Sequence, residues 1–490
     1  MSNININRRQ FLKTSCVGAS MLLTIQLPTL ANNIKEKPIS KDWCLYVHIN
    51  ADNSVVIYSP VAEMGQHMKT TGPMILAEEM DLDWQLVTIA DDCPTYLSRD
   101  AHGTIGYKYA DMRSGGSHAV RKNWDYMRNA GATVKKMMIE EAAAVWKVKA
   151  STLQTQDSRV FNVASGQSIS YGTLAKGASK RQVDTKNLKL KTRSEYRIMG
   201  KGKRTVDIDK IVTGAPLYGI DADYSNLVQV VIHRAPWQGA SVASFNKLAA
   251  LAVTGVIDVI KIDRQVENQG EPYERQIISA GVAVVAETLW AAIKAKNLLN
   301  TQWQKNADYF HQSSRTQQED FRKQVQSTNK GKVRRNDGDV STALKNSNLV
   351  LDHIYETPLF MHACMEPHNC IADIREQNAT IITGHQFPNR VAEEVDKFTE
   401  VDGLNVEIIN RRIGGGFGRR YERDFVREAI LISKRLRRPI KVTWMREDEM
   451  ERDFFAPANV VRIQAGLDST NKVIAWHHKQ VQTSGGPHDN

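Results

Sequence analysis

The spacing of apolar and polar residues predicts a chain that mixes strands with helices. Alternation over residues 45–58 is typical of a strand, and the apolar repeat over residues 121–146 predicts a long helix. The unbroken apolar run 281–286 predicts a buried strand, and a helix is expected over residues 287–299. Strands and helices alternate without a strict β–α–β period, so the pattern predicts an α+β fold.

Shorter patterns complete this picture. A helix is expected to begin near Thr71, and further strands are expected at residues 227–233 and 440–444. Residues 159–205 predict short strands joined by basic loops. Residues 303–347 are polar and at best helical, which favours a surface connection.

The start of the chain has the features of an export signal. Arg8 and Arg9 form a twin-arginine pattern, an apolar stretch follows at residues 17–27, and small residues precede a cleavage point after Ala31. This order is typical of a signal peptide, here residues 1–31, and twin arginines indicate the Tat route. We therefore expect a periplasmic protein. The apolar stretch is too short for a comfortable membrane span, so none is expected in the mature chain.

Charge and cysteine content exclude some classes of function. The net charge is +11, from 65 Lys and Arg against 54 Asp and Glu, but basic runs such as 176–204 contain few aromatic residues. That composition argues against a base-stacking surface, so no nucleic-acid partner is expected. The five cysteines form no Cys-x-x-Cys pair, which argues against an iron–sulfur cluster or zinc ribbon held by this chain.

The glycine-rich segment 414–420, Gly-Gly-Gly-Phe-Gly-Arg-Arg, is the most informative motif. Its glycines allow close backbone approach to a ligand, and it runs into a helical pattern whose N-terminus could present N–H groups to an anion or oxo group. Arg419 stands where a dinucleotide-binding loop would need its third glycine, and no Gly-Lys-Ser/Thr ending marks a P-loop. The alternative is a tight turn that serves packing alone.

Two further loops precede helical patterns. The turn 63–67, Glu-Met-Gly-Gln-His, carries an amide that can donate and accept hydrogen bonds, which suits an oxo- or thiolate-bearing cofactor. Segment 114–117, Ser-Gly-Gly-Ser, is either an anion site at a helix N-terminus or a helix cap formed by Ser117. An extended anionic cofactor, reached from several loops, would explain all three segments.

Two other polar motifs are weaker. In segment 362–370, His, Cys and Glu alternate like ligands on one strand face, but Pro367 argues against a regular central strand. We therefore predict no metal site there and favour Glu366 or Asn369 as a structural or cofactor-side polar group. The segment Gly384-His385-Gln386 follows a predicted strand and could line a pocket, with His385 as a candidate general base.

Together these motifs resemble the large, molybdenum-binding subunit of the xanthine oxidase family, most closely its isoquinoline 1-oxidoreductase beta-subunit type. The resemblance covers nearly all of the chain. It is carried by the twin-arginine start and by the segments Glu63–Gln66, Ala77–Glu79, Gly115–Ser117, Gly281–Ala286, Met365–Pro367, Gly414–Arg420 and Trp444–Asp448.

The resemblance implies a molybdenum–molybdopterin cofactor in its cytosine dinucleotide form. The implied reaction hydroxylates an N-heteroaromatic or aldehyde substrate with oxygen from water. Electrons would leave through a small iron–sulfur partner subunit, with a cytochrome c as a further candidate acceptor. The implied cofactor-binding residues are Gly65, Gln66, Gly115, Gly116, Ser117, Gln386, Gly415, Gly416, Phe417, Gly418 and Arg419.

Within this set the implied roles differ. Gln66 and the backbone of Phe417 and Gly418 would lie beside the metal's oxo group and the pterin. Segment 115–117 would hold the pyrophosphate or nucleotide. Arg419 would add positive charge near the cofactor, and Gln386 would line the same pocket.

The implied architecture is a multi-domain α+β large-subunit fold. Its expected parts are the signal peptide, an N-terminal molybdopterin-binding segment, a hammerhead-like α/β domain, a polar connector and the first part of a molybdopterin-binding domain, at residues 1–31, 32–200, 201–305, 306–347 and 348–490. The family's catalytic glutamate would lie beyond Asn490, so no catalytic residue is assigned and a C-terminally truncated second molybdenum domain is expected. The alternatives are a non-catalytic truncated remnant and a basic secreted protein that binds polyanions.

Overall fold

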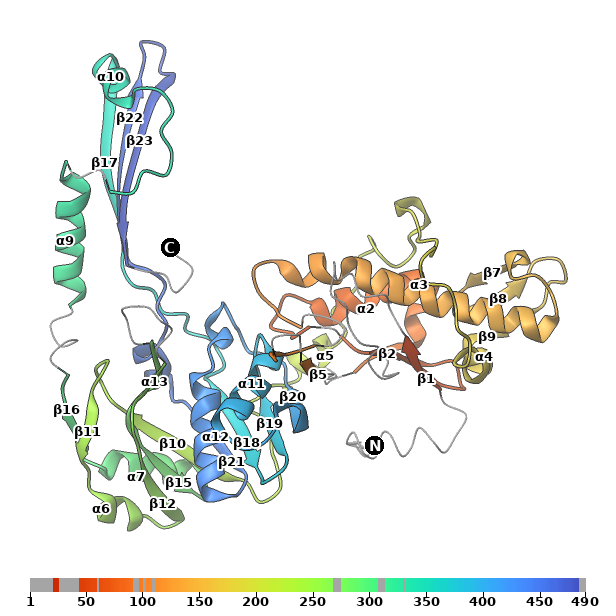
Figure 1. The fold of residues 1–490 in the computed structure, drawn as a ribbon, viewed down its shortest axis with the longest axis horizontal. Helices are drawn as coiled ribbons and strands as arrows, with labels where there is room; N and C mark the ends of the chain where they lie inside the picture. The colour runs from red at the N-terminus through yellow and green to blue at the C-terminus, as the bar shows by residue number, and fades with distance from the viewer. Residues whose placement is uncertain are drawn as a thin grey trace. The chain divides into compact units, whose positions relative to one another are not determined.

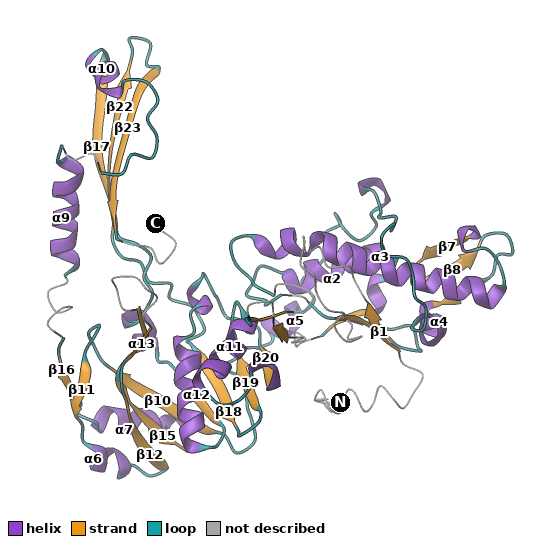
Figure 2. Ribbon diagram, viewed as in Figure 1, coloured by secondary structure: helices purple, strands orange, loops and turns teal. Residues whose placement is uncertain are grey.

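The computed structural model describes residues 21–25, 44–59, 61–90, 97–99, 103–107, 112–267, 275–306, 313–328 and 331–483. The chain forms two compact units built from discontinuous segments. The first contains residues 1–230, 286–289 and 364–444, and the second contains residues 231–285, 290–363 and 445–490. Most of the predicted signal peptide lies outside the described residues. Both units contain helices and strands (Figure 2), so the predicted α+β class is confirmed.

The first unit begins with a four-stranded sheet in the order β1-β2-β3-β4, formed by Met21–Ile25, Cys44–Ile49, Val55–Ile57 and Val87–Ile89. The single strand predicted over residues 45–58 is therefore wrong, because a turn divides it into β2 and β3. Asp52 makes this turn: its carboxylate accepts hydrogen bonds from the backbone N–H and hydroxyl of Ser54, at 2.9 and 2.7 Å.

Helices α2 (Met68–Glu79) and α3 (His118–Trp146) pack against each other in this unit (Figure 1). The predicted long helix is confirmed as α3, which begins three residues before the expected position (121 minus 118). Gly131 allows the close approach, because a Cβ atom there would lie 2.5 Å from the carbonyl oxygen of Leu76. Buried side chains such as Ile75, Met127 and Val134 fill the core around this contact.

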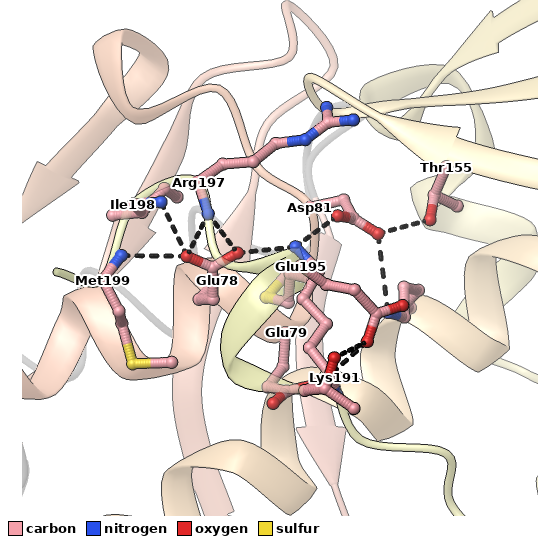
Figure 3. Close-up of polar contacts among 12 residues, drawn as sticks. Glu78, Glu79, Asp81, Thr155, Lys191, Glu195, Arg197, Ile198 and Met199 are labelled. Carbon is pink, nitrogen blue, oxygen red and sulfur yellow. Dashed lines mark hydrogen bonds and ion pairs between the residues drawn. The ribbon is translucent and has the colours of Figure 1, made fainter. Parts of the chain in front are cut away.

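Residues 180–205 run as an irregular segment that is held to α2 by two buried glutamates (Figure 3). The Glu78 carboxylate accepts hydrogen bonds from the backbone N–H groups of residues 197–199 and from Lys191 Nζ at 2.6 Å. The Glu79 carboxylate accepts from Lys191 N at 3.1 Å and from Arg128 Nε of α3 at 2.7 Å. A cavity of about 210 Å³ lies beside this network, and none of the predicted cofactor-binding residues lines it.

The first unit has two small sheets and two short helices after α2. Strands β5 (Leu97–Arg99) and β6 (Ile105–Tyr107) form a hairpin. A three-stranded sheet has the order β7-β8-β9, formed by Leu153–Gln156, Arg159–Asn162 and Ser168–Ser170. Helices α4 (Tyr171–Ala178) and α5 (Ile208–Val212) follow, and the strand pattern predicted for residues 159–205 had missed α4.

The rest of the first unit is a sheet with helices α11 (Pro388–Phe398) and α12 (Asp424–Leu436). Its strand order is β21-β18-β19-β20, formed by Ile440–Thr443, Asn369–Ile374, Ala379–Thr383 and Val406–Asn410. Strand β18 is antiparallel to both neighbours, whereas β19 and β20 are parallel. The first residues of β10 (Val228–Arg234) pair in parallel with β21, and the chain passes into the second unit within β10.

The second unit contains β15 (Gly281–Ala286), which hydrogen-bonds between β12 (Val256–Ile262) and β10. All six residues of β15 are buried, as its apolar run predicts. The predicted helix after it is α7 (Leu289–Leu298). Smaller elements complete this part: β11 Ser241–Ser244 pairs with β16 Gln302–Gln304, β13 Gln265–Glu267 pairs with β14 Arg275–Ile278, and the short helices are α6 Lys247–Leu251 and α13 Arg446–Glu451.

A second sheet in this unit has the order β17-β22-β23, formed by Leu349–Thr357, Asn459–Leu467 and Val473–Gln482. Helix α9 (Ser314–Gln326) runs beside it and α10 (Val340–Lys345) contacts its far end (Figure 1). Both helices lie within the predicted polar connection. Among the described helices of the whole chain, none combines the length and the apolar character that a bilayer crossing requires.

Candidate functional site

The turn at residues 63–67 is organised by the buried carboxylate of Glu63. It accepts hydrogen bonds from the backbone N–H groups of Gly65, His67 and Lys69, at 2.7, 3.2 and 2.8 Å. Helix α2 has no side-chain cap from its N-cap residue His67, so Glu63 supplies the acceptor that its first turn needs. The Glu63 carbonyl accepts from Ile413 N at 2.8 Å, which joins this turn to the glycine-rich loop.

The loop at residues 114–117 is fastened to the same turn. The buried Ser114 hydroxyl donates to the carbonyl oxygen of Ala62 at 2.6 Å. The Gln66 amide nitrogen donates to that carbonyl at 2.8 Å and to the Ser114 hydroxyl at 3.3 Å. The Gln66 side chain is therefore oriented by both loops while the residue remains exposed.

Gln386 bridges this loop to the glycine-rich loop from a buried position. Its amide nitrogen donates to the Ser114 carbonyl at 2.7 Å, and its amide oxygen accepts from Gly418 N at 3.0 Å. Its backbone repeats the bridge, because Ser114 N donates to the Gln386 carbonyl and Gln386 N donates to the Arg420 carbonyl. The structure thus brings all three predicted loops together: the Gln386 amide joins two of them, and Ser114 joins the third through Ala62.

The glycine-rich loop requires its glycines for two reasons. Gly415 and Gly418 have φ of 99° and 98°, values that favour glycine strongly. Gly416 faces the centre of the cluster, where a Cβ atom would lie 2.7 Å from both the Gln386 amide oxygen and the Met64 sulfur. The close approach of the loop to Gln386 therefore depends on a missing side chain.

Glu366 and Arg420 hold the glycine-rich loop through buried contacts. The buried Glu366 carboxylate accepts from Gly414 N at 2.7 Å and from Ile220 N at 2.9 Å. It pairs with the fully buried guanidinium of Arg420 at 3.1 Å, and Arg420 also donates to the Glu366 carbonyl at 2.6 Å. Of the two roles predicted for Glu366 or Asn369, structural or cofactor-side, these contacts give Glu366 the structural one.

Arg419 lies at the junction of the glycine-rich loop and α12. Its guanidinium is buried, pairs with both carboxylate oxygens of Asp424 at 3.0 and 2.8 Å, and lies over the ring of Trp444. The Asp424 charge offsets that of Arg419 at the start of α12. Arg419 therefore anchors the loop to the helix and does not present a free charge at the surface.

The exposed side of the cluster consists of residues from all three loops. Gly65, Gln66, Gly116, Ser117 and Phe417 are exposed. In the part of the chain that the structure describes, the backbone N–H groups of Gly116, Ser117 and Phe417 have no hydrogen-bond acceptor. Two of these N–H groups belong to the loop that enters α3, where the helix dipole favours an anion.

Each loop also holds a residue other than glycine in the left-handed region. These residues are His67, Ser117 and Phe417, with φ of 64°, 55° and 52°. Such conformations cost about 1–3 kcal/mol each and cluster at ligand-binding sites. Strained backbone, exposed N–H groups and an oriented amide fit an extended, anionic cofactor with oxo groups.

His385 lies within the cluster but is fully enclosed. Its Nδ1 accepts from Phe387 N at 2.9 Å, and its Nε2 lies 3.3 Å from the Glu422 carbonyl oxygen, so the ring is neutral with the proton on Nε2. Burial, with nearby Arg423, lowers the pKa of His385 to about 3. Both ring nitrogens are occupied, which excludes the predicted general-base role in this arrangement.

The low pKa of His385 predicts a pH-dependent stability. Because the unfolded chain binds a proton near pH 6.5 and the folded chain does not, stability is full above pH 6.5 and falls as pH drops toward 3. Between pH 7 and pH 5, the loss of stability in urea unfolding should be about 2 kcal/mol smaller in His385→Gln than in the wild type. The exposed His478→Gln is the matched control, and an unchanged pH dependence in His385→Gln would contradict the assignment.

The polar residues of segment 362–370 do not converge on one point. His362 pairs with Asp453 at 2.9 Å, whereas the Cys364 sulfur lies 3.7 Å from the Gly416 carbonyl oxygen. Cys364 and Cys370 are buried free thiols, and burial raises the pKa of Cys370. Across the described ranges, no group of three His, Cys, Asp or Glu side chains is arranged to hold a metal ion.

Sequence reasoning missed the two residues that assemble the site. Glu63 and Ser114 were noted only as parts of loops, yet their side chains make the contacts that order the neighbouring backbone. A carboxylate shortly before a helix is a usable capping signal. No local signal shows that Ser114 would bond to Ala62, 52 residues away.

Comparisons with known proteins identify domains and relatives of this chain. Two molybdopterin cofactor-binding domain models match residues 5–223 and 321–489. A membrane-bound aldehyde dehydrogenase (pyrroloquinoline-quinone) from Gluconacetobacter polyoxogenes is 29% identical over 97% of this chain and 60% of that protein. Isoquinoline 1-oxidoreductase subunit beta from Brevundimonas diminuta is 25% identical over 89% of this chain and 58% of that protein.

Among solved structures, quinoline 2-oxidoreductase from Pseudomonas putida 86 aligns with a TM-score of 0.43 at 18% identity. That alignment covers 56% of this chain and 38% of the other. The chain spans about three-fifths of the length of the aldehyde dehydrogenase and of the isoquinoline 1-oxidoreductase subunit.

The domain matches define a molybdopterin-binding protein with an α+β fold. Within that class, the chain belongs to the xanthine oxidase family of molybdenum hydroxylases and corresponds to their large subunit.

Proposed function

We propose that this chain is the cofactor-binding component of an oxidoreductase that hydroxylates an aldehyde or an N-heteroaromatic compound with oxygen from water. The observation that carries the proposal is the junction of three loops through Gln386 and Ser114, with an exposed side that includes Gln66 and Phe417. The two relatives, named for an aldehyde and for isoquinoline, support both substrate classes.

Each loop has a separate task in this proposal. Gln66, whose amide is held by Ala62, Met64 and Ser114, would line the oxo face of the cofactor from the exposed side of its turn. The N–H groups of Gly116 and Ser117, at the start of α3, bind the pyrophosphate of a cytosine dinucleotide form. When bound, the molybdenum cofactor supplies the oxygen-transfer and redox chemistry.

Export and the electron-transfer partners are inferred from the sequence and from the family. A twin-arginine signal at residues 1–31 would direct the folded protein to the periplasm. A small iron–sulfur subunit would accept the electrons, with a cytochrome c as a further acceptor. The basic balance of the chain, +11, would favour docking of an acidic redox partner.

The proposal is tested by the reaction of the purified complex of this chain with its partners. Isoquinoline and benzaldehyde would be supplied in ¹⁸O-labelled water, and the product would be analysed by mass spectrometry. Label in a hydroxylated product is expected. Turnover of neither compound, or oxygen drawn from O₂, would contradict the proposed reaction.

Substitution of Gly416 should prevent cofactor binding. A Cβ atom at Gly416 would lie 2.7 Å from the Gln386 amide oxygen and the Met64 sulfur, so Gly416→Ala must displace the Gln386 amide and the Met64 side chain or the loop itself. Gly202→Ala is the control, because a Cβ there meets nothing within 4 Å. Elemental analysis of the purified complex should show about a tenfold loss of molybdenum per chain in the first variant. Equal molybdenum in both variants would remove the glycine-rich loop from the site.

A further inference from the structure

The cavity of about 210 Å³ beside the Glu78 network lies where the irregular segment at residues 180–205 meets the turn after α2. The turn contributes residues 81–85 to one wall, together with Asp157. Asp157 belongs to this wall because Asp83 N donates to the hydroxyl of the neighbouring Ser158 at 3.0 Å. The segment contributes the other wall, with Lys191, Arg197, Ile198 and Lys203.

The most buried charges of the lining satisfy one another. Lys191 Nζ lies 2.6 Å from a carboxylate oxygen of Glu78 and 2.6 Å from one of Asp81. The Thr155 hydroxyl donates to Asp81 at 2.6 Å, and Lys135 pairs with Asp81 at 3.4 Å. Two carboxylates therefore face two ammonium groups, and this network leaves no net charge to attract a ligand ion.

Four more accessible charges of the lining have no such partners. Within the part of the chain that the structure describes, Asp83, Asp157, Arg197 and Lys203 form no ion pair. Arg197 uses its backbone N–H for Glu78, and its guanidinium extends away from that carboxylate (Figure 3). Two carboxylates on one wall and two cations on the other thus line one cavity without meeting.

Apolar side chains complete the lining. Leu82 and Ile198 are buried, and Trp84 is half-buried and packs against the core of the unit. Trp84 is thereby held in place and offers an aromatic surface on which a second ring can pack. The cavity volume lies below the roughly 300–1,000 Å³ of pockets that take drug-sized ligands, so the cavity suits a molecule the size of one amino acid.

We propose that this cavity binds a free aromatic α-amino acid. Its carboxylate would be held by Arg197 and Lys203, its ammonium group by Asp83 and Asp157, and its ring by Trp84. A zwitterion matches both walls, whereas an ion of a single sign leaves one pair of charges unmatched. None of the residues of the three-loop cluster lines this cavity, so the site is separate from the proposed cofactor site.

A ligand in this cavity would fasten the segment at residues 180–205 to the body of the first unit. The two cations belong to the segment, whereas the two carboxylates belong to the turn after α2 and to the turn between β7 and β8. A ligand that contacts both parts binds only while the segment is docked, so it stabilises the docked form by mass action. The amino acid would thus control how often this segment opens.

Isothermal titration calorimetry of the purified full chain tests the ligand chemistry. The probe is L-phenylalanine, compared with phenethylamine, which lacks the carboxylate, and 3-phenylpropionate, which lacks the ammonium group. We expect L-phenylalanine to bind with a Kd of about 1 mM or below. Each analogue should bind at least about tenfold more weakly, because it loses the hydrogen bonds of one charged group.

A paired substitution tests the basic wall. Arg197→Gln should weaken the binding of L-phenylalanine by about tenfold or more. This variant keeps the backbone N–H that Glu78 accepts, so the fold is retained. Arg193→Gln is the matched control, because Arg193 is an exposed arginine of the same segment that does not line the cavity. Its Kd should stay within about twofold of the wild type.

Hydrogen exchange measures the coupling between the ligand and the segment. At an L-phenylalanine concentration about tenfold above its Kd, exchange at the N–H groups of residues 197–199 should slow by about tenfold in the wild type and by about twofold or less in Arg197→Gln. No binding of L-phenylalanine, equal binding of either analogue, an unchanged Kd in Arg197→Gln, or unchanged exchange in the wild type would each overturn the proposal. None of these measurements depends on molybdenum or on turnover.

Discussion

Replacing Glu366 by alanine should collapse the glycine-rich loop and destabilise the first unit by about 3–5 kcal/mol. The change removes the acceptor for Gly414 N and Ile220 N and leaves the fully buried Arg420 guanidinium without its carboxylate. A buried charge that loses its partner has no water to replace it. Arg420 supports the Gln386 backbone through its own carbonyl, so the damage should reach the junction of the three loops.

Urea unfolding measures the loss of stability, and elemental analysis of the purified complex measures molybdenum per chain. Glu376→Ala is the matched control, because Glu376 is exposed and near in sequence. We expect the control to change stability by less than about 0.5 kcal/mol. If Glu366→Ala unfolded at the wild-type urea concentration, the supporting role assigned to this pair would be wrong.

Replacing Glu78 by alanine should lower the stability of the first unit by a similar amount, through contacts away from the glycine-rich loop. The buried carboxylate accepts from three backbone N–H groups, those of residues 197–199, and from Lys191 (Figure 3). Each buried donor left without an acceptor costs about 1–3 kcal/mol, so the total should be about 3 kcal/mol or more. The segment at residues 180–205 should detach from α2 before the rest of the unit unfolds.

Glu78 also predicts the direction of an acid effect. Burial alone would raise its pKa, but hydrogen bonds from Lys191 and the three backbone N–H groups hold the pKa below the ordinary value of 4.5. A lowered folded-state pKa means that this stabilisation is complete above pH 4.5 and is lost as pH falls through the folded value. Glu78→Gln should therefore show a shallower loss of melting temperature between pH 5 and pH 3 than the wild type.

Limited proteolysis tests whether the segment at residues 180–205 detaches from α2 in Glu78→Ala. Cleavage within residues 180–205 should accelerate in Glu78→Ala while the exposed Glu400→Ala keeps the wild-type rate. Hydrogen exchange at the N–H groups of residues 197–199 should rise in the same variant. Wild-type rates for both readouts would show that other contacts hold this segment.

Several elements could be predicted because their signals are local. The apolar repeat of α3, the unbroken run of β15 and the glycine-to-helix transition before α12 each depend on neighbours in sequence. The strand predicted over residues 45–58 was wrong because one Asp-centred turn outweighed the alternation. No local signal shows that each unit is built from separated segments of the chain. Residues 364–444, for example, join the N-terminal part only through tertiary packing.

The sequence by itself determined that three loops could bind an anionic cofactor, because glycine spacing and helix starts are properties of short segments. Only the tertiary structure decided that they meet. Gln386 reaches the Ser114 carbonyl across 272 residues, and Asp424 offsets the charge of Arg419 inside the fold. Hydrogen-bond partners and burial are set by which segments the folded core brings together, and that is information no single motif contains.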